Sequence, residues 1–181
     1  GVNWSLEASE GDNNWTVFVN DTHGNLAMDS VNFSVDTNPP SVSITNPSLD
    51  TLYDYSTIDL NYLASDSQQL DSCWYSTDDG ATNSSRQNCG VNWSLEASEG
   101  DNNWTVFAND SANNLAWASV NFSVDTTPPS LSIVYPQVDT DYELNNLDLN
   151  YSASDSQQLD SCWYSNDDGA TNSSRQNCGV N

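Results

Sequence analysis

The sequence predicts an all-β protein whose units are antiparallel β-sandwiches arranged as tandem repeats of 89 residues. Three observations support this prediction: a gapless internal repeat, short runs of alternating apolar and polar residues between turn signals, and no capped run with a helical period. The unit has the size of one small sandwich of about 100 residues. Each repeat is therefore expected to bury a core of its own.

The repeat is explicit in the segment GVNWSLEASEGDNNWTVF, which begins at Gly1 and again at Gly90. Aligning each residue with the one 89 positions later needs no gap from Gly1 to Cys89, and 69 of these 89 positions are identical. A third copy begins with Gly179-Val-Asn. Near-identity favours a repeated structural element, because a binding site usually appears in one specialised domain.

Two Pro-Pro pairs mark the domain boundaries, Pro39-Pro40 and Pro128-Pro129. A double proline cannot lie in a central strand and forms a stiff extended connector. We therefore expect one complete domain over residues 39–127. Residues 1–38 are then the C-terminal part of a preceding domain, and residues 128–181 are the N-terminal part of the next one.

Seven strands are expected in the complete domain. The pattern places them near residues 41–45, 57–65, 70–77, 82–88, 91–98, 103–109 and 116–125, and turn signals separate them. This spacing is typical of an immunoglobulin-like or fibronectin-type sandwich.

Period-two alternation predicts which side chains face the core. The inward sets are Ile58, Leu60, Tyr62 and Ala64; Trp104, Val106 and Ala108; and Val120, Phe122 and Val124. The same parity assigns Trp74 and Trp93 to the core. Trp117 stands at the position that Met28 occupies in the first copy, and it is expected to be partly buried. An aromatic platform for sugars is the functional alternative for the tryptophans. Core packing is preferred, because Trp supplies much of a small core's buried area.

The charge balance excludes several partners. The chain has 26 acidic residues against Arg86 and Arg175, no Lys, and a net charge of −24. Nothing is available to neutralise phosphates, so nucleic acid is excluded as a partner. The same charge opposes docking on an anionic membrane surface, and the segment has no apolar run long enough for direct membrane insertion.

No catalytic site is predicted. His23 is the sole histidine and its counterpart in the second copy is Ala112, so no nucleophile–base pair belongs to the repeat. Asp78 and Asp79 could in principle serve acid–base catalysis, but they precede Gly80 in a turn, where Asp is common. We expect the chain not to be an enzyme.

The four cysteines form two copies of one pair, Cys73 with Cys89 and Cys162 with Cys178. A zinc site would need four ligands at short spacings, which this pattern and a single histidine do not supply. We expect one disulfide in each repeat. Closing a loop of this length stabilises a fold by about 3 kcal/mol in the chain-entropy model, and disulfides imply an oxidising compartment.

N-linked glycans are the expected modification. Sequons of the form Asn-X-Ser/Thr exceed the chance expectation for this composition. Outward parity makes Asn121 and Asn103 the best candidates, together with Asn83 beside a turn. The sequons begin at Asn3, Asn14, Asn20, Asn32, Asn83, Asn92, Asn103, Asn109, Asn121, Asn150 and Asn172.

A structural Ca²⁺ site is expected where one domain meets the next. In a sandwich the linker that enters the first strand lies near two loops of the same domain, and these segments carry Asp36, Asp66, Asp71 and Asp110. Ca²⁺ takes six to eight oxygen ligands. The alternative interpretation is that Asp is simply frequent in the loops of an acidic chain.

Two segments resemble known surface proteins. The residues from Trp104 to Leu115, followed by Val120-Asn-Phe-Ser-Val-Asp-Thr-Thr-Pro-Pro129, resemble the ending of Ig-like repeats in large prokaryotic surface proteins. The segment Leu70-Asp-Ser-Cys73-Trp74-Tyr-Ser is similar to a strand common in archaeal surface proteins. Asn113 departs from the usual Gly, which Gly24 keeps. The resemblance implies extracellular stalks, adhesins, sheaths and filaments, but no single binding partner.

The preferred functional hypothesis is structural: a glycosylated extracellular filament, fibre or stalk at the cell surface, whose partners are neighbouring copies of itself, head to tail. An adhesin or carbohydrate-binding module on such a stalk is the first alternative, and a spacer in a large secreted enzyme is the second. The partial domains could be completed by covalent continuation of the chain or by strand exchange between copies. Covalent continuation is preferred.

Overall fold

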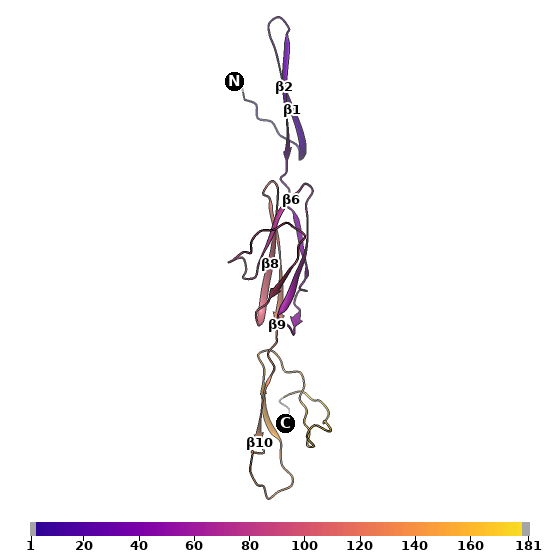
Figure 1. The fold of residues 1–181 in the computed structure, drawn as a ribbon, viewed down its shortest axis with the longest axis vertical. Coiled ribbons are helices and arrows are strands. Elements are labelled where there is room, and N and C mark those ends of the chain that lie inside the picture. Colours follow the sequence, from indigo (N-terminus) through magenta and orange to yellow (C-terminus); the bar gives the residue numbers. More distant parts are fainter. Residues whose placement is uncertain (1–2, 179–181) are drawn as a thin grey trace. The chain divides into compact units, whose positions relative to one another are not determined.

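The computed structural model describes residues 3–178, all of whose regular elements are β-strands (Figure 1). The start of the third copy, residues 179–181, lies outside the described residues. The chain divides into two units, Gly1–Val124 and Asp125–Asn181. Within the described residues no helix is long and apolar enough to cross a membrane.

The first unit opens with a hairpin and continues into a seven-stranded sandwich. The hairpin pairs β1 (Gly11–Asn20) with β2 (Leu26–Val35). The strands of the sandwich are β3 (Ser41–Asn46), β4 (Leu52–Tyr53), β5 (Thr57–Ser65), β6 (Leu70–Ser76), β7 (Trp93–Glu96), β8 (Gly100–Asp110) and β9 (Leu115–Val124).

The sandwich consists of two sheets with strand orders β3-β5-β7 and β4-β9-β8-β6. All pairings are antiparallel except that of the short β4 with β9. Placing β3, β5 and β7 opposite β9, β8 and β6 is the arrangement of immunoglobulin-like and fibronectin-type domains. The predicted all-β sandwich fold is confirmed.

The second unit contains one regular pair, β10 (Ser130–Tyr135) with β11 (Asn150–Ser154). The structural division after Val124 lies close to the predicted boundary at residues 127 and 128. The predicted boundary at residues 38 and 39 falls inside the first unit, between the hairpin and the sandwich.

The core of the sandwich follows the predicted alternation on three strands. Trp104 lies at its centre with 1% of its surface exposed, and its ring meets that of Phe122 edge to face at a centroid distance of 4.8 Å. Trp93 is partly buried against the same core, stacked on Tyr62 at 5.1 Å. The buried hydrophobic cluster is Ile58, Leu60, Tyr62, Cys73, Trp104, Val106, Ala108, Val120, Phe122 and Val124.

The inward orientation predicted for Trp74 is wrong, and a β-bulge explains why. The register between β6 and β8 shifts between Leu70 and Ser72. The extra residue turns every later side chain to the opposite face, so Cys73 points into the core and Trp74 points outward. Trp74 is nevertheless buried, because its ring stacks on Phe107 at 5.5 Å and the Arg86 guanidinium covers it at 4.0 Å.

The predicted strand at residues 82–88 is also wrong, because this segment is a loop with one isolated bridge from Gln87 to Cys73. Side chains close in sequence accept hydrogen bonds from backbone N–H groups that would otherwise pair with a neighbouring strand. Asp78 Oδ1 accepts the Thr82 N–H at 2.8 Å, and Ser84 Oγ accepts the Tyr75 N–H at 3.0 Å. Such local hydrogen bonds compete with strand pairing. The two-residue strand β4 was not predicted, because it is too short to show alternation.

Candidate metal centre at the junction before the sandwich

Three carboxylates from three separate segments meet where the hairpin leads into the sandwich. Asp36 follows β2, Asp66 follows β5, and Asp110 ends β8. One carboxylate oxygen from each lies within 4.8 Å of the others. Asp71, the fourth residue expected there, is exposed on β6 beside the bulge and does not belong to the group. The expected calcium site therefore narrows to three residues, named here the junction cluster.

Asp110 is held by the tight turn that connects β8 to β9. Its Oδ1 accepts the N–H groups of Ala112 at 2.9 Å and Asn114 at 2.8 Å, and its Oδ2 accepts Asn114 Nδ2 at 2.8 Å. Asp21 makes the matching bonds with Asn25 in the hairpin. The local sequence therefore fixes the orientation of this carboxylate in both copies.

The other two carboxylates are anchored by their own loops. Asp66 Oδ1 accepts the Gln68 N–H at 2.8 Å, and Asp36 Oδ1 accepts the Asn38 N–H at 3.3 Å. Asn114 also donates to the backbone carbonyl of Asp36 at 3.1 Å, which joins the linker to the turn of the sandwich. Asp66 and Asp36 therefore each have one side-chain oxygen bound within their own segment, whereas both oxygens of Asp110 are bound within its turn.

The remaining oxygen of Asp36 lacks a donor. Asp36 Oδ2 is buried and has no hydrogen-bond partner among the described residues. The same holds for Asp155 Oδ2, and Asp155 is the repeat counterpart of Asp66. A buried polar atom without a protein partner calls for a water or an ion. The two atoms belong to different positions of the repeat, because Asp36 corresponds to Asp125 and not to Asp155.

The electrostatics of the junction cluster favour a cation. Burial raises the pKa of Asp36 above its ordinary value, and the negative charges of Asp110 and Asp66 add to the rise against the opposing N–H of Asn38. Burial also acts to raise the pKa of Asp110, but the hydrogen bonds from Asn114 and the turn outweigh it and lower that pKa. Asp110 therefore stays ionised beside Asp36.

Neither arginine, both of which lie in the described part of the chain, neutralises this charge. The chain has two Lys/Arg residues in all. Arg86 lies over the Trp74 ring at 4.0 Å, and Arg175 lies over the Trp163 ring at 4.5 Å. Carboxylate oxygens are the ligands that Ca²⁺ prefers, whereas structural Zn²⁺ sites are built mainly from Cys and His. The donor chemistry of the three residues therefore fits Ca²⁺ better than Zn²⁺.

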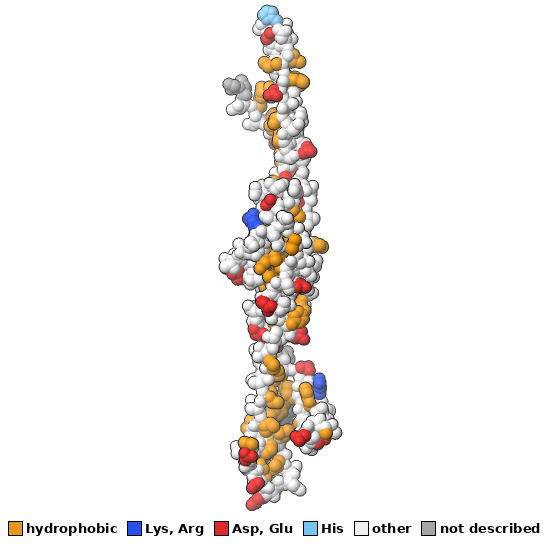
Figure 2. Space-filling view, viewed as in Figure 1, with side chains coloured by type: hydrophobic (Ala, Val, Ile, Leu, Met, Phe, Trp, Pro, Cys, Tyr) orange, Lys and Arg blue, Asp and Glu red, His pale blue; other side chains and the backbone are white. Residues whose placement is uncertain are grey.

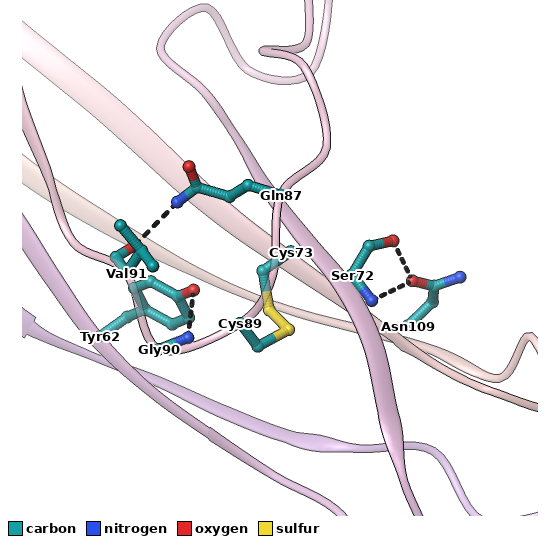
Figure 3. Close-up of a disulfide and its surroundings, with 8 residues drawn as sticks. All are labelled: Tyr62, Ser72, Cys73, Gln87, Cys89, Gly90, Val91 and Asn109. Carbon is teal, nitrogen blue, oxygen red and sulfur yellow. Dashed lines mark hydrogen bonds between the residues drawn. A yellow bond between two sulfur atoms is a disulfide. The ribbon is translucent and has the colours of Figure 1, made fainter.

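Both predicted disulfides are confirmed. Cys73 is bonded to Cys89 and Cys162 to Cys178, with Cα–Cα distances of 5.0 and 5.1 Å. Figure 3 shows the bridge between Cys73 and Cys89, which ties the loop between β6 and β7 back onto β6. Beside it, Gly90 N–H donates to Tyr62 Oη at 3.0 Å and Gln87 Nε2 donates to the Val91 carbonyl at 2.9 Å, so the loop is also hydrogen-bonded to the sandwich.

The sequon asparagines differ in their access to solvent. All are exposed except Asn103, which is half-buried, and Asn109, which is buried. Asn109 Oδ1 accepts hydrogen bonds from both the N–H and the Oγ of Ser72 (Figure 3). The structure therefore argues against a glycan on Asn109, since a folded sheet has no room for one there.

Comparisons with known proteins yield no family. No family model matches the chain, and no curated protein matches it. Among solved structures, the fibronectin(III)-like modules of Clostridium thermocellum CbhA share 21% identity over 65% of this chain and 64% of theirs, with a TM-score of 0.43. An engineered protein shares 12% identity over 51% of this chain and 21% of its own, with a TM-score of 0.36. Function is therefore inferred from the chain's own residues.

Proposed function

We propose that the chain is a structural segment of an extracellular fibre or stalk in which sandwich domains follow one another head to tail. The two disulfides support a location in an oxidising compartment. One observation carries the proposal. The parts that flank the central sandwich expose the same residues that the sandwich buries.

The hairpin and the second unit illustrate this exposure. Val17 of β1 is 51% exposed, whereas its repeat counterpart Val106 is 0% exposed in the sandwich. Leu149 of the second unit is 43% exposed, whereas its counterpart Leu60 is 0% exposed. Figure 2 shows hydrophobic side chains at the surface over both of these parts. Exposed apolar surface of this extent is typical of an interaction site.

The central sandwich indicates how these surfaces would be covered. Within it, β8 pairs with β6, and Phe107 lies opposite Trp74. The counterpart of β8 is β1, and the counterpart of β6 is the segment 159–165 of the second unit. The hairpin of one repeat is therefore shaped to complete the front half of another. This complementarity would be satisfied in either of two ways: the chain continues covalently, or separate copies exchange strands.

Self-association of the 181-residue chain tests this proposal. We expect open, concentration-dependent oligomers, because each docking event leaves one hairpin and one second unit still uncovered. A chain of residues 39–127, which holds a whole sandwich, should be monomeric. Sedimentation velocity measures both.

A matched pair of variants makes the self-association test specific. Val17→Asp puts a charge at a position whose counterpart is buried, and it should shift the chain strongly toward monomer. Ser30→Asp adds the same charge at a position whose counterpart, Ser119, is exposed, and it should change little. A monodisperse monomer of the unsubstituted chain at every concentration would contradict the proposal.

We further propose that Ca²⁺ binds the junction cluster and stiffens the connection between consecutive domains. Extracellular calcium modules bind with a Kd of about 10⁻⁴–10⁻³ M. Ca²⁺ at 100 times its Kd should stabilise the fold by about 2.7 kcal/mol. Asp66→Asn should abolish the Ca²⁺-dependent rise in melting temperature. Asp71→Asn, which removes the same charge outside the cluster, should preserve it.

The effect of Ca²⁺ should depend on pH. The pKa of Asp36 is raised in the folded state, so the folded protein binds this proton more tightly than the unfolded chain does. The metal-free fold therefore loses stability as the pH rises through the folded-state pKa of Asp36. Protons and Ca²⁺ compete for the same oxygens. The shift in melting temperature caused by Ca²⁺ should therefore be small at about pH 4 and grow toward neutrality. A melting temperature that a chelator leaves unchanged at neutral pH would rule out the site.

A carbohydrate-binding role is the second candidate, and one observation favours it. Trp74, Phe107 and Trp117 occupy one row across β6, β8 and β9 on the outer face of the sheet, and Trp117 is 63% exposed. The Arg86 guanidinium covers the Trp74 ring, so the exposed Trp117 would make the main contact with a sugar. Polysaccharide binding that Trp117→Ala removes would support a module of this kind on the stalk.

A further inference from the structure

The sequons at residues 103 and 121 are not independent sites, because the sheet places their asparagines face to face. Asn103 of β8 lies directly opposite Asn121 of β9, and Asn103 Nδ2 donates a hydrogen bond of 2.6 Å to Asn121 Oδ1. In the hairpin, Asn14 lies opposite Asn32 and donates to it in the same direction. Both repeats therefore contain an asparagine pair with one donor and one acceptor.

The donor of the sandwich pair is poorly placed to carry a glycan. A glycan is attached through Nδ2, which Asn103 uses in the bond to Asn121. Asn103 Oδ1 is buried, and the side chain as a whole is half-buried. The hydroxyl of its sequon is also engaged, since buried Thr105 shares a hydrogen bond of 2.8 Å with Ser119.

The acceptor presents the opposite arrangement. Asn121 is exposed and uses Oδ1 in the pair, and no hydrogen bond among the described residues involves its Nδ2. Asn32 repeats this arrangement in the hairpin, where it is exposed and accepts through Oδ1. The amide nitrogen of the second asparagine therefore points away from the pair.

We propose that each pair carries a single N-glycan on its second asparagine, Asn121 in the sandwich and Asn32 in the hairpin, while Asn103 and Asn14 stay unmodified and hold that residue in place. The inference rests on the proposed extracellular location. Directly opposed residues in an antiparallel pair have Cβ atoms about 4.5–5.5 Å apart. Two branched sugars cannot both start from positions that close.

The reaction is a transfer of sugar from a lipid-linked oligosaccharide phosphate. A bond forms between Asn121 Nδ2 and the anomeric carbon of the first sugar, and the bond from that carbon to the phosphate oxygen breaks. The amide nitrogen loses one proton, and the lipid phosphate is the leaving group. The second hydrogen stays on Nδ2, and Oδ1 continues to accept from Asn103. The glycan therefore leaves the pair intact and decorates the outer face of the sheet.

Site occupancy in secreted protein tests the proposal. The 181-residue chain is secreted from a eukaryotic host that glycosylates Asn-X-Ser/Thr, and chymotryptic glycopeptides are mapped on the folded fraction. Ser123→Ala removes the sequon of Asn121 but keeps the asparagine pair, and it should lower the intact mass by one glycan. Thr105→Val removes the sequon of Asn103 with nearly unchanged shape, and it should leave the mass of the attached glycans unchanged.

The exposed loop sequon at Asn83 serves as the internal reference. Glycan on Asn83 and Asn121 with Asn103 bare supports the inference. A glycan on Asn103 overturns the inference, and so does a glycan on Asn83 when Asn121 is bare; in either case the proposed glycosylated extracellular chain still stands. If all three asparagines are bare, both the inference and the proposed glycosylated extracellular chain are overturned.

Discussion

Replacing Trp104 by alanine should lower the free energy of unfolding of the central sandwich by about 3–5 kcal/mol. The side chain is 1% exposed and packs edge to face against Phe122. Its removal costs the transfer free energy of a large aromatic group and leaves a cavity that neighbouring strands cannot fill. Because small domains have a total stability of about 5–15 kcal/mol, the variant should be close to unfolding at room temperature.

Trp117→Ala is the matched control for this prediction. Trp117 lies on β9 with 63% of its surface exposed, so its loss should change the free energy of unfolding by no more than about 0.5 kcal/mol. Urea titration of a chain of residues 39–127, followed by circular dichroism, measures both variants. Equal losses for the two tryptophans would show that the burial described here is wrong.

Removing the disulfide of the sandwich should produce the second large effect. The double substitution Cys73→Ala and Cys89→Ala should lower the free energy of unfolding by about 3 kcal/mol, because it frees a loop closed over a sequence separation of 16. Cys73 is also fully buried in the core, so loss of its sulfur adds a small packing cost. The freed loop should also hold Arg86 less firmly over Trp74.

The repeat provides the control for the disulfide as well. In the 181-residue chain, the double substitution Cys162→Ala and Cys178→Ala removes the equivalent bridge from the second unit. The thermal transition of the central sandwich should then stay in place, whereas it should fall in the first double variant. Identical transitions for both would mean that the bridge does not stabilise the domain that contains it.

The junction cluster could be predicted because sequence and topology agree there. Turn residues placed Asp66 and Asp110 in loops, and a sandwich of this class brings those loops close to the linker that holds Asp36. Asp71 was grouped with them because it follows the same loop in sequence. The bulge in β6 leaves Asp71 exposed and outside the cluster. No pattern of residues in the sequence predicted that bulge.

The sequence by itself determined the features whose physical cause is local or periodic. The 89-residue repeat, the alternation that buries Leu60 and Val106, and the pairing of Cys73 with Cys89 all follow from spacing along the chain. Only the tertiary structure decided which residues meet across strands. The outward turn of Trp74 depends on a bulge against β8, and the donor role of Asn103 depends on its register with Asn121. Register is set by contacts between strands that are distant in sequence, so a single strand's pattern does not reveal it.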